Sequence, residues 1–250
     1  MIQLKNADQI NIMKIAGRIT GEALLTAGEQ IKEGVTTKHI DDVIRTYIEK
    51  HDARPSFLGY GGFPGSSCIS INDEVIHGIP SKDKVLHEGD IVKIDVGAYY
   101  RGFHGDSART FPVGKVSDEA ARLIEVTKNS FFKGLDAVKI DGRIGDIGAA
   151  IDGYVRGNGF STVRKYIGHG VGKDLHEQPD VPNFGTAGRG TRLASGMVIA
   201  IEPMVNVGGY AVKELNDNWT VVTADGSLSA HYEHTVALTE NGVILLTLVE

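Results

Sequence analysis

The sequence predicts an α+β protein whose two similar halves pack about a pseudo-twofold axis. Segments with helical periodicity alternate with strand-like segments along the chain. Several short patterns also recur in the same order in both halves. A length of 250 residues with 41% hydrophobic content is enough for one sizeable core. We therefore expect a single domain over residues 1–250, with halves of roughly 1–115 and 116–250 and a site between them.

Composition narrows the class of protein. A formal charge of -6 argues against nucleic acid or an anionic membrane as the main partner. The single Cys cannot form an internal disulfide, and the sequence shows neither a signal-peptide core nor a membrane span. We expect a soluble cytoplasmic protein. Glycine, at 32 residues, is enriched over the usual share of about 7%, which indicates tight turns or close backbone approaches.

The elements follow from periodicity. Isoleucines at helical spacing predict one helix around residues 12–23 and a second after Thr37. The stretch 57–65, rich in glycine and aromatic residues, predicts a loop. Residues 89–97 alternate like a strand. Helical periodicity returns at 117–138 and 144–155, and mostly strand and turn are expected after Gly170.

The duplication is clearest in the strands. At an offset of 107 residues, Gly89–Asp95 matches Gly196–Glu202, so each half has a glycine six residues before an acid. At a similar offset Ile31–Gly34 matches Val138–Gly142, and each match precedes a helical pattern. A His-x-acid pattern follows in a further strand of each half, at His104–Asp106 and at His231–Glu233.

The acids of the first half are expected to repel each other. If the segments around Asp95 and Asp106 form a hairpin that turns at Tyr100-Arg101, the two acids lie directly opposite, with Cβ atoms about 4.5–5.5 Å apart. Either one acid takes a proton or a cation binds between them.

The second half repeats this arrangement, because Glu202 and Glu233 lie opposite in a hairpin centred on Asp217-Asn218. Four acids without a matching basic cluster are more easily explained by metal than by shared protons. The glycines around His169 would allow its imidazole to approach an ion closely. Four carboxylates and one imidazole suit two divalent cations bridged by water, and oxygen-rich ligation favours Mn, Fe or Co over a closed Zn site. Acidic hairpins on a solvated surface are the alternative.

Seven ordered motifs, spread over nearly the whole chain, resemble those of type I methionine aminopeptidases. They are His77–Pro80, Asp95, Gly105–Asp106, Gly168–Gly172, His176–Pro179, Ile201–Pro203 and Tyr232–Thr235. The resemblance implies the pita-bread fold, with two pseudo-symmetric halves, an antiparallel sheet core and outer helices. It also implies metal-dependent removal of the initiator methionine from nascent proteins and peptides, with a preference for a small second residue. In the family, a metal-bridging hydroxide attacks the first peptide bond.

The resemblance implies a role for each matching residue. The metal ligands would be Asp95, Asp106, His169, Glu202 and Glu233, with Asp106 and Glu233 bridging the two ions. Glu202 would also handle protons, and His77 and His176 would contact the scissile amide and the carbonyl oxygen as catalytic and substrate-binding groups. The pocket for the methionine side chain would be lined by Tyr60, Phe63, Cys68 and Trp219.

The cofactors implied are two divalent ions, with Mn, Fe or Co favoured and Zn as a further candidate. A monovalent cation would use the backbone near Asn72, Glu74 and Ser229. The expected partners are peptides and nascent chains with N-terminal methionine, with transient proximity to the ribosome, and we expect a monomer. Three residues depart from those common in the family, at Phe57, Leu175 and His231, and they leave the shape of the pocket open rather than the metal centre.

Two other functions are compatible with the same fold. An Xaa-Pro aminopeptidase or prolidase normally carries an additional N-terminal domain, for which the residues before Asp95 leave no room. A non-catalytic binding protein should have lost ligands, whereas all five are present. A nucleophilic role for Cys68 is disfavoured, because no Cys-His-Asn arrangement can be placed around it.

Overall fold

The computed structural model describes residues 2–249. The helices are α1 (Ala7–Gly28), α2 (Thr37–Lys50), α3 (Asp118–Asp136) and α4 (Ile144–Gly157), with one 3-10 turn, η1 (Tyr60–Gly62). The strands of the first half are β1 (Arg54–Pro55), β2 (Ser67–Ile71), β3 (Glu74–Ile76), β4 (Ile91–Tyr100) and β5 (Phe103–Pro112). Those of the second half are β6 (Ser161–Thr162), β7 (Gly168–Gly170), β8 (Glu177–Val181), β9 (Val198–Ile201), β10 (Met204–Asn206), β11 (Val212–Glu214), β12 (Val221–Thr223), β13 (Ser229–His231), β14 (His234–Thr239) and β15 (Gly242–Leu245).

All four predicted helices are confirmed, and local capping explains where three of them begin. Asn6 accepts a hydrogen bond from the Gln9 backbone N–H at 2.9 Å, while the Gln9 side chain accepts one from the Asn6 N–H at 3.0 Å. Thr36 and Ser117 cap α2 and α3 through their hydroxyl oxygens. The isoleucines of α2 at helical spacing are fully buried, at Ile40, Ile44 and Ile48.

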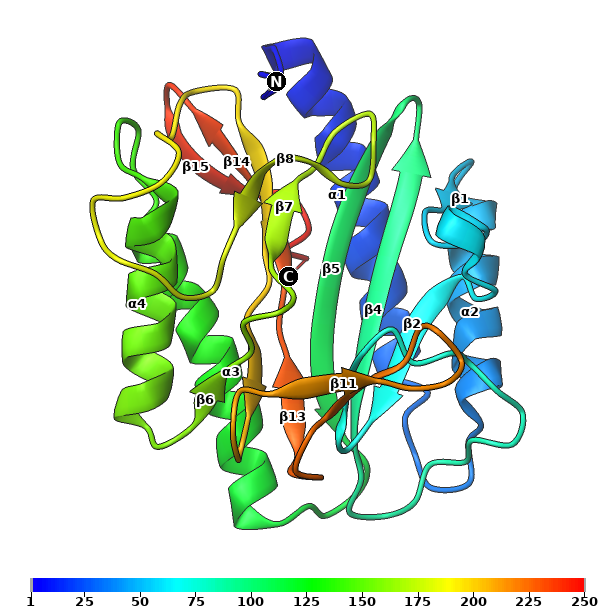
Figure 1. Cartoon of the computed structure of the whole chain (residues 1–250). Helices are drawn as coiled ribbons and strands as arrows, with labels where there is room; N and C mark the ends of the chain where they lie inside the picture. The colour runs from blue at the N-terminus through cyan, green and yellow to red at the C-terminus, as the bar shows by residue number, and fades with distance from the viewer. Residues whose placement is uncertain (1, 250) are drawn as a thin grey trace.

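The helices cover antiparallel sheets from outside. Helix α1 passes behind β4 and β5, and α2 lies next to α1, against β1 and β2 (Figure 1). Helices α3 and α4 pack together at the other side of the molecule. Strand β4 pairs with β1, β2 and β5, and a five-stranded sheet runs in the order β15-β14-β9-β7-β8. None of the helices in the described part of the chain is long and apolar enough to cross a membrane.

The duplication is visible in the structure. Helices α2 and α4 have 14 residues each and begin at Thr37 and Ile144, so the sequence offset of 107 is kept. Strands β4 and β9 both begin two residues after a glycine with positive φ, Gly89 at 95° and Gly196 at 87°. The predicted α+β class with two pseudo-symmetric halves is thus confirmed, while the division into 1–115 and 116–250 stays a prediction.

The register predicted for the first hairpin is wrong by two residues. The turn is Arg101-Gly102 rather than Tyr100-Arg101, and Asp95 pairs with Ala108 instead of Asp106. Arg101 and Gly102 have φ values of 45° and 94°, as a two-residue type I′ turn requires. Because Asp106 pairs with Gly97, the two acids lie diagonally on the same face of the sheet.

The second prediction of register is confirmed. Strands β11 and β12 form a hairpin centred on Asp217-Asn218, with Val212 opposite Thr223. In the same register Ile201 pairs with His234, and Met204 pairs with His231. Glu202 and Glu233 therefore fall opposite each other between two paired segments.

Strand β5 joins the two halves. The Glu233 N–H donates to the Ala108 carbonyl at 2.9 Å, and the Asp106 N–H donates to Thr235 Oγ1 at 2.9 Å. Thr235 Oγ1 in turn donates to the Asp106 carbonyl at 2.8 Å. These bonds hold Asp106 of one half beside Glu233 of the other, at the centre of the molecule.

Candidate metal centre

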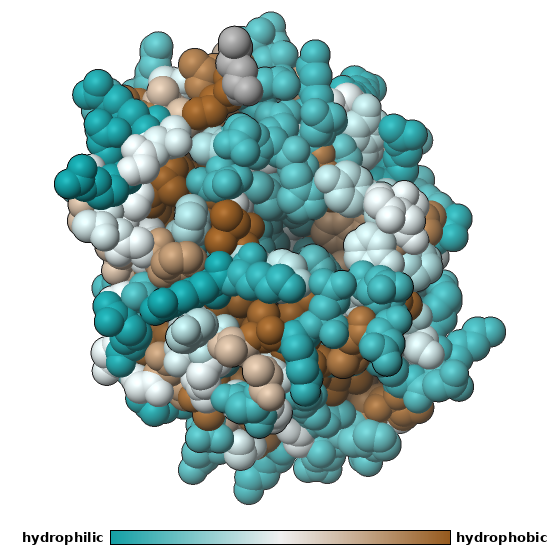
Figure 2. Space-filling model, viewed as in Figure 1, coloured by the Kyte–Doolittle hydropathy of each residue, from teal (hydrophilic) through white to brown (hydrophobic). Residues whose placement is uncertain are grey.

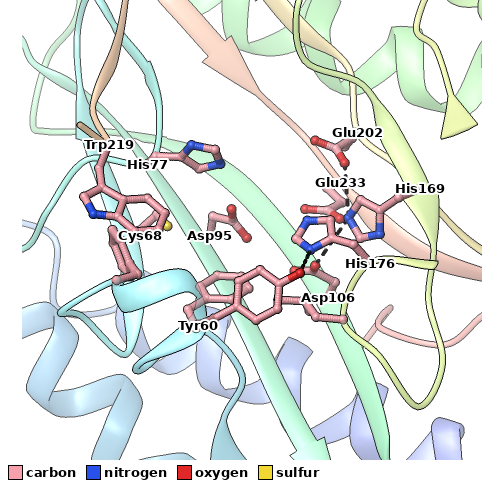
Figure 3. Close-up of a pocket in the computed structure, with 13 residues that line it drawn as sticks. Tyr60, Cys68, His77, Asp95, Asp106, His169, His176, Glu202, Trp219 and Glu233 are labelled. Atoms are coloured by element: carbon pink, nitrogen blue, oxygen red, sulfur yellow. Dashed lines mark hydrogen bonds and ion pairs between the residues drawn. The ribbon is translucent and has the colours of Figure 1, made fainter. Parts of the chain in front are cut away.

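A single pocket collects every residue predicted for the divalent metal centre, for catalysis and for the methionine side chain. The residues of the predicted monovalent-cation site, Asn72, Glu74 and Ser229, do not line it. Its wall also includes Phe57 and Leu175, which sequence reasoning noted only as departures. The space-filling view shows a hollow near the middle of this face (Figure 2), and the pocket side chains converge from several strands and loops (Figure 3). The lining residues are Phe57, Tyr60, Phe63, Cys68, His77, Asp95, Asp106, His169, Leu175, His176, Glu202, Trp219 and Glu233.

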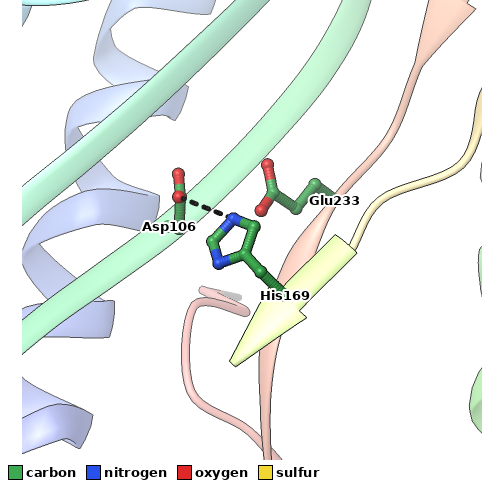
Figure 4. A group of neighbouring side chains, drawn as sticks. All are labelled: Asp106, His169 and Glu233. Atoms are coloured by element: carbon green, nitrogen blue, oxygen red, sulfur yellow. Dashed lines mark ion pairs between the residues drawn. The ribbon is translucent and has the colours of Figure 1, made fainter. Parts of the chain in front are cut away.

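Three side chains at the floor of this pocket could hold a metal ion together. One donor atom each from Asp106, His169 and Glu233 lies within 4.8 Å of the others (Figure 4). His169 Nε2 is 3.8 Å from Asp106 Oδ2 and 3.5 Å from Glu202 Oε1. Asp95 reaches the same space from β4 (Figure 3).

The orientation of His169 suits it to be a ligand. Its Nδ1 lies 2.9 Å from the Gly170 carbonyl oxygen, which can only accept a hydrogen bond, so Nδ1 carries the proton. Nε2 then keeps a free lone pair directed at the carboxylates. Burial lowers the pKa of His169 to about 3, so the imidazole is neutral at physiological pH.

The carboxylates lack the partners that buried charges require. Burial raises the pKa of Asp95 to about 7 and raises those of Asp106, Glu202 and Glu233 well above their usual range. Among the described residues, Asp95 Oδ1, Asp106 Oδ1 and Glu233 Oε1 are buried without a hydrogen-bond partner. Oxygens buried in this way are suited to bind a cation, and a set of carboxylates with one imidazole fits divalent metal.

The glycines beside His169 have a structural role that the sequence did not predict. A Cβ on Gly168 would lie 2.4 Å from the Ala200 carbonyl oxygen, and a Cβ on Gly170 would lie 2.4 Å from that of Gln178. Both glycines are therefore required by the neighbouring backbone of β8 and β9.

Two further histidines reach the mouth of the pocket. His176 Nδ1 lies 2.8 Å from the Tyr60 hydroxyl, and its ring centroid is 4.1 Å from that of His169. His77 has a φ of 59°, a left-handed conformation that favours glycine and that costs energy for a residue with a Cβ. Burial lowers the pKa of His77 to about 4, so it too is neutral.

One wall of the pocket is apolar. The rings of Phe63 and Trp219 meet edge to face at 5.1 Å, and Cys68 packs in the same cluster. Trp219 comes from the β11–β12 turn, where the Asp217 carboxylate accepts the Trp219 N–H at 3.0 Å. Burial raises the pKa of the Cys68 thiol, which opposes formation of a nucleophilic thiolate.

Two residues near the centre were not recognised from the sequence. His231 was expected to affect only the shape of the pocket, but its Nε2 lies 3.9 Å from Glu202 Oε2 and 4.0 Å from Glu233 Oε2. Lys93 is fully buried two residues before Asp95, and its Nζ donates to the Asn72 carbonyl at 2.7 Å. Strand alternation was the available signal, since it places Lys93 on the same face as Asp95.

The antiparallel sheets, the outer helices and the buried carboxylate centre define a pita-bread metallohydrolase. Residues 11–240 match metallopeptidase family M24, and the chain belongs to this family. The methionine aminopeptidase of Clostridium acetobutylicum is 56% identical over 250 residues, covering 100% of both chains. The crystal structure of methionine aminopeptidase from Thermotoga maritima matches with a TM-score of 0.97 and 43% identity, covering 99% of both chains. The resemblance to methionine aminopeptidases, the fold and a metallopeptidase activity are thus confirmed.

The alternative enzyme class is a more distant match. Prolidase from Pyrococcus furiosus has a TM-score of 0.80 and 25% identity, and the match covers 99% of this chain but 66% of that one. The two proteins share the fold, and the sequence identity is lower than the 43% to the methionine aminopeptidase of known structure.

Proposed function

We propose that this protein removes N-terminal methionine from peptides and nascent proteins whose second residue is small. The observation that carries the proposal is that one pocket has both an apolar, aromatic wall and a buried group of carboxylates with an imidazole. Full-length relatives named methionine aminopeptidase support the choice of substrate.

The ions would be held by Asp95, Asp106, His169, Glu202 and Glu233. Bound divalent ions supply Lewis-acid polarisation and activation of water near neutral pH. We propose two divalent ions, with Mn, Fe or Co favoured because oxygen ligands predominate, and with Zn as a further candidate.

The protein's own groups orient and protonate the substrate. The Tyr60 hydroxyl can donate to His176 Nδ1 at 2.8 Å, which leaves the proton of a neutral imidazole on Nε2. That N–H can donate to the carbonyl oxygen of the scissile bond as charge develops there. His77 would hold the scissile amide from another side, and Glu202 would accept and return a proton.

The methionine side chain of the substrate would pack against the apolar wall of the pocket. An unbranched thioether gains from contact with aromatic rings and from loss of water, and Phe63, Trp219, Cys68 and Tyr60 offer such a surface. Phe57 and Leu175 narrow the same slot.

The remaining proposals concern partners and ions. We expect a monomer in the cytoplasm that meets nascent chains in transient proximity to the ribosome. A monovalent cation near Asn72, Glu74 and Ser229 would have to compete with Lys93, whose ammonium already bonds to the Asn72 carbonyl.

The proposal is tested by release of methionine from Met-Ala-Ser with Mn, Co or Fe added, with Xaa-Pro peptides as the alternative substrates. Asp106→Ala should abolish release, and His77→Ala should reduce it by about 10²- to 10⁴-fold. Replacement of an exposed aspartate on α3, Asp136→Ala, serves as the matched control and should leave activity unchanged. Undiminished activity in Asp106→Ala would overturn the metal centre, and preference for Xaa-Pro peptides would overturn the substrate.

A further inference from the structure

The imidazole of His231 is buried without a partner. The residue is 2% exposed, and neither Nδ1 nor Nε2 has a hydrogen bond. His234, on the neighbouring strand, is equally buried but satisfied, since Nδ1 is 2.8 Å from Thr247 Oγ1 and Nε2 is 3.1 Å from the Tyr232 hydroxyl. Buried polar groups in native proteins are rarely unpaired, so the His231 ring requires an explanation.

The backbone of His231 is firmly held. Its N–H donates to Thr110 Oγ1 at 2.9 Å, and its carbonyl accepts from the same hydroxyl at 2.9 Å. Strand pairing with Met204 adds a second constraint. The ring can therefore adjust only by rotation of its side chain.

The ring faces the metal centre from one side. Its Nε2 lies 3.9 Å from Glu202 Oε2 and 4.0 Å from Glu233 Oε2. The other oxygen of the first carboxylate, Glu202 Oε1, faces His169 Nε2 at 3.5 Å. The two oxygens of Glu202 are thus divided between a proposed metal ligand and His231.

We propose that His231 is a positioning residue of the metal centre, whose Nε2–H donates to Glu202 Oε2, with Glu233 Oε2 as the second acceptor. This inference rests on the proposed metal centre. A neutral imidazole carries one N–H, and the adjacent carboxylate oxygens favour its placement on Nε2. Closure of the gap by about 1 Å through side-chain rotation gives an ordinary hydrogen bond.

Direct ligation by His231 is the less favourable alternative. The described residues that line the pocket include all five proposed ligands, whereas His231 is not one of them. A bond from His231 to Glu202 Oε2 leaves Oε1 directed at the ion. Outer partners of this kind hold the ligand in place and increase its affinity for metal.

The test is a Co(II) titration of the full-length protein, followed by calorimetry and by visible absorption. His231→Leu removes the donor and should weaken Co(II) binding by about 10- to 100-fold. His231→Gln keeps an N–H donor and should restore affinity to within about threefold of the parent. The control His234→Gln, which removes the satisfied imidazole, should lower thermal stability but leave Co(II) affinity unchanged.

The outcomes separate the possible errors. If the unaltered protein binds no Co(II), the proposed metal centre itself is wrong. If it binds Co(II) and His231→Leu binds equally well, His231 does not position the ligands. If His231→Gln is as impaired as His231→Leu and its absorption spectrum shows a lost nitrogen ligand, His231 is a direct ligand. If His234→Gln weakens Co(II) binding to the same degree, the effect reflects general loss of packing, and the proposal fails.

Discussion

Replacement of Asp95 by Asn should stabilise the metal-free protein, and the gain should increase with pH. Burial raises the pKa of Asp95 from 3.8 to about 7, so ionisation of this carboxyl opposes folding. Its contribution to stability is fully present below pH 3.8 and is lost as the pH rises through about 7. By linkage the total loss is about 4 kcal/mol, of which about 3 kcal/mol falls between pH 5 and pH 8.

Comparison of two proteins isolates this effect from other titrations. Burial lowers the pKa values of His169 and His231 to about 3, so these histidines cost stability as the pH falls below 6.5, which is the opposite sign. Both histidines are present in Asp95→Asn and in the parent, and their contributions cancel in the difference. The repulsion that Asp95 exerts on Asp106 and Glu202 is also removed, which adds to the gain.

The assay is urea unfolding of chelator-treated protein at pH 5, 6, 7 and 8, for the parent and for Asp95→Asn. The difference in free energy of unfolding should grow by about 3 kcal/mol over this range. Addition of Mn should stabilise the parent at pH 8 and should stabilise the variant less. A difference that does not change between pH 5 and pH 8 would refute the claim that burial without metal raises the pKa of this carboxyl.

Three further predictions test the surroundings of the site. Trp219→Ala should raise KM for methionine peptides roughly tenfold with little change in kcat, because an apolar wall binds ground state and transition state alike. Steady-state kinetics measure both constants. An unchanged KM would show that Trp219 does not bind the methionine side chain. Lys5→Met should lower the free energy of unfolding by about 3–5 kcal/mol, measured by urea unfolding, because it leaves a buried carboxylate without its partner. In the parent, Lys5 Nζ lies 2.5 Å from Glu177 Oε2, and both side chains are 4% exposed. The double variant Lys5→Met/Glu177→Met should recover most of the loss. Exchange of KCl for choline chloride should leave the Tm of the parent unchanged, because Lys93 Nζ already donates to the Asn72 carbonyl. The Tm of Lys93→Ser should instead depend on K⁺. A K⁺-dependent Tm in the parent would show that a free cation binds there.

Much of the local structure could be predicted because its causes lie within a few residues. Periodic isoleucines and side-chain caps specify α1 and α2, and the 107-residue repeat of a glycine before an acid predicts strands β4 and β9. The set of candidate ligands was also accessible, since residue types and ordered motifs carry that information.

The strand register and the contacts between distant residues were decided by the tertiary structure. Turn chemistry at Arg101-Gly102 moved Asp106 two residues from the position expected opposite Asp95. The backbone of β8 and β9 leaves no room for a Cβ at Gly168 or Gly170, which no local pattern shows.

The sequence by itself determined which helices form, that the chain repeats, and which acids and histidines are available to a metal. Only the tertiary structure placed Asp106 beside Glu233 and left the His231 ring unpaired next to Glu202. The physical reason is that helices and turns depend on neighbours in the chain, whereas these contacts join distant segments. Asp106 bonds to Thr235, 129 residues away, and His231 faces Glu202 on another strand. Their geometry is the combined result of strand register and core packing, which no local pattern specifies.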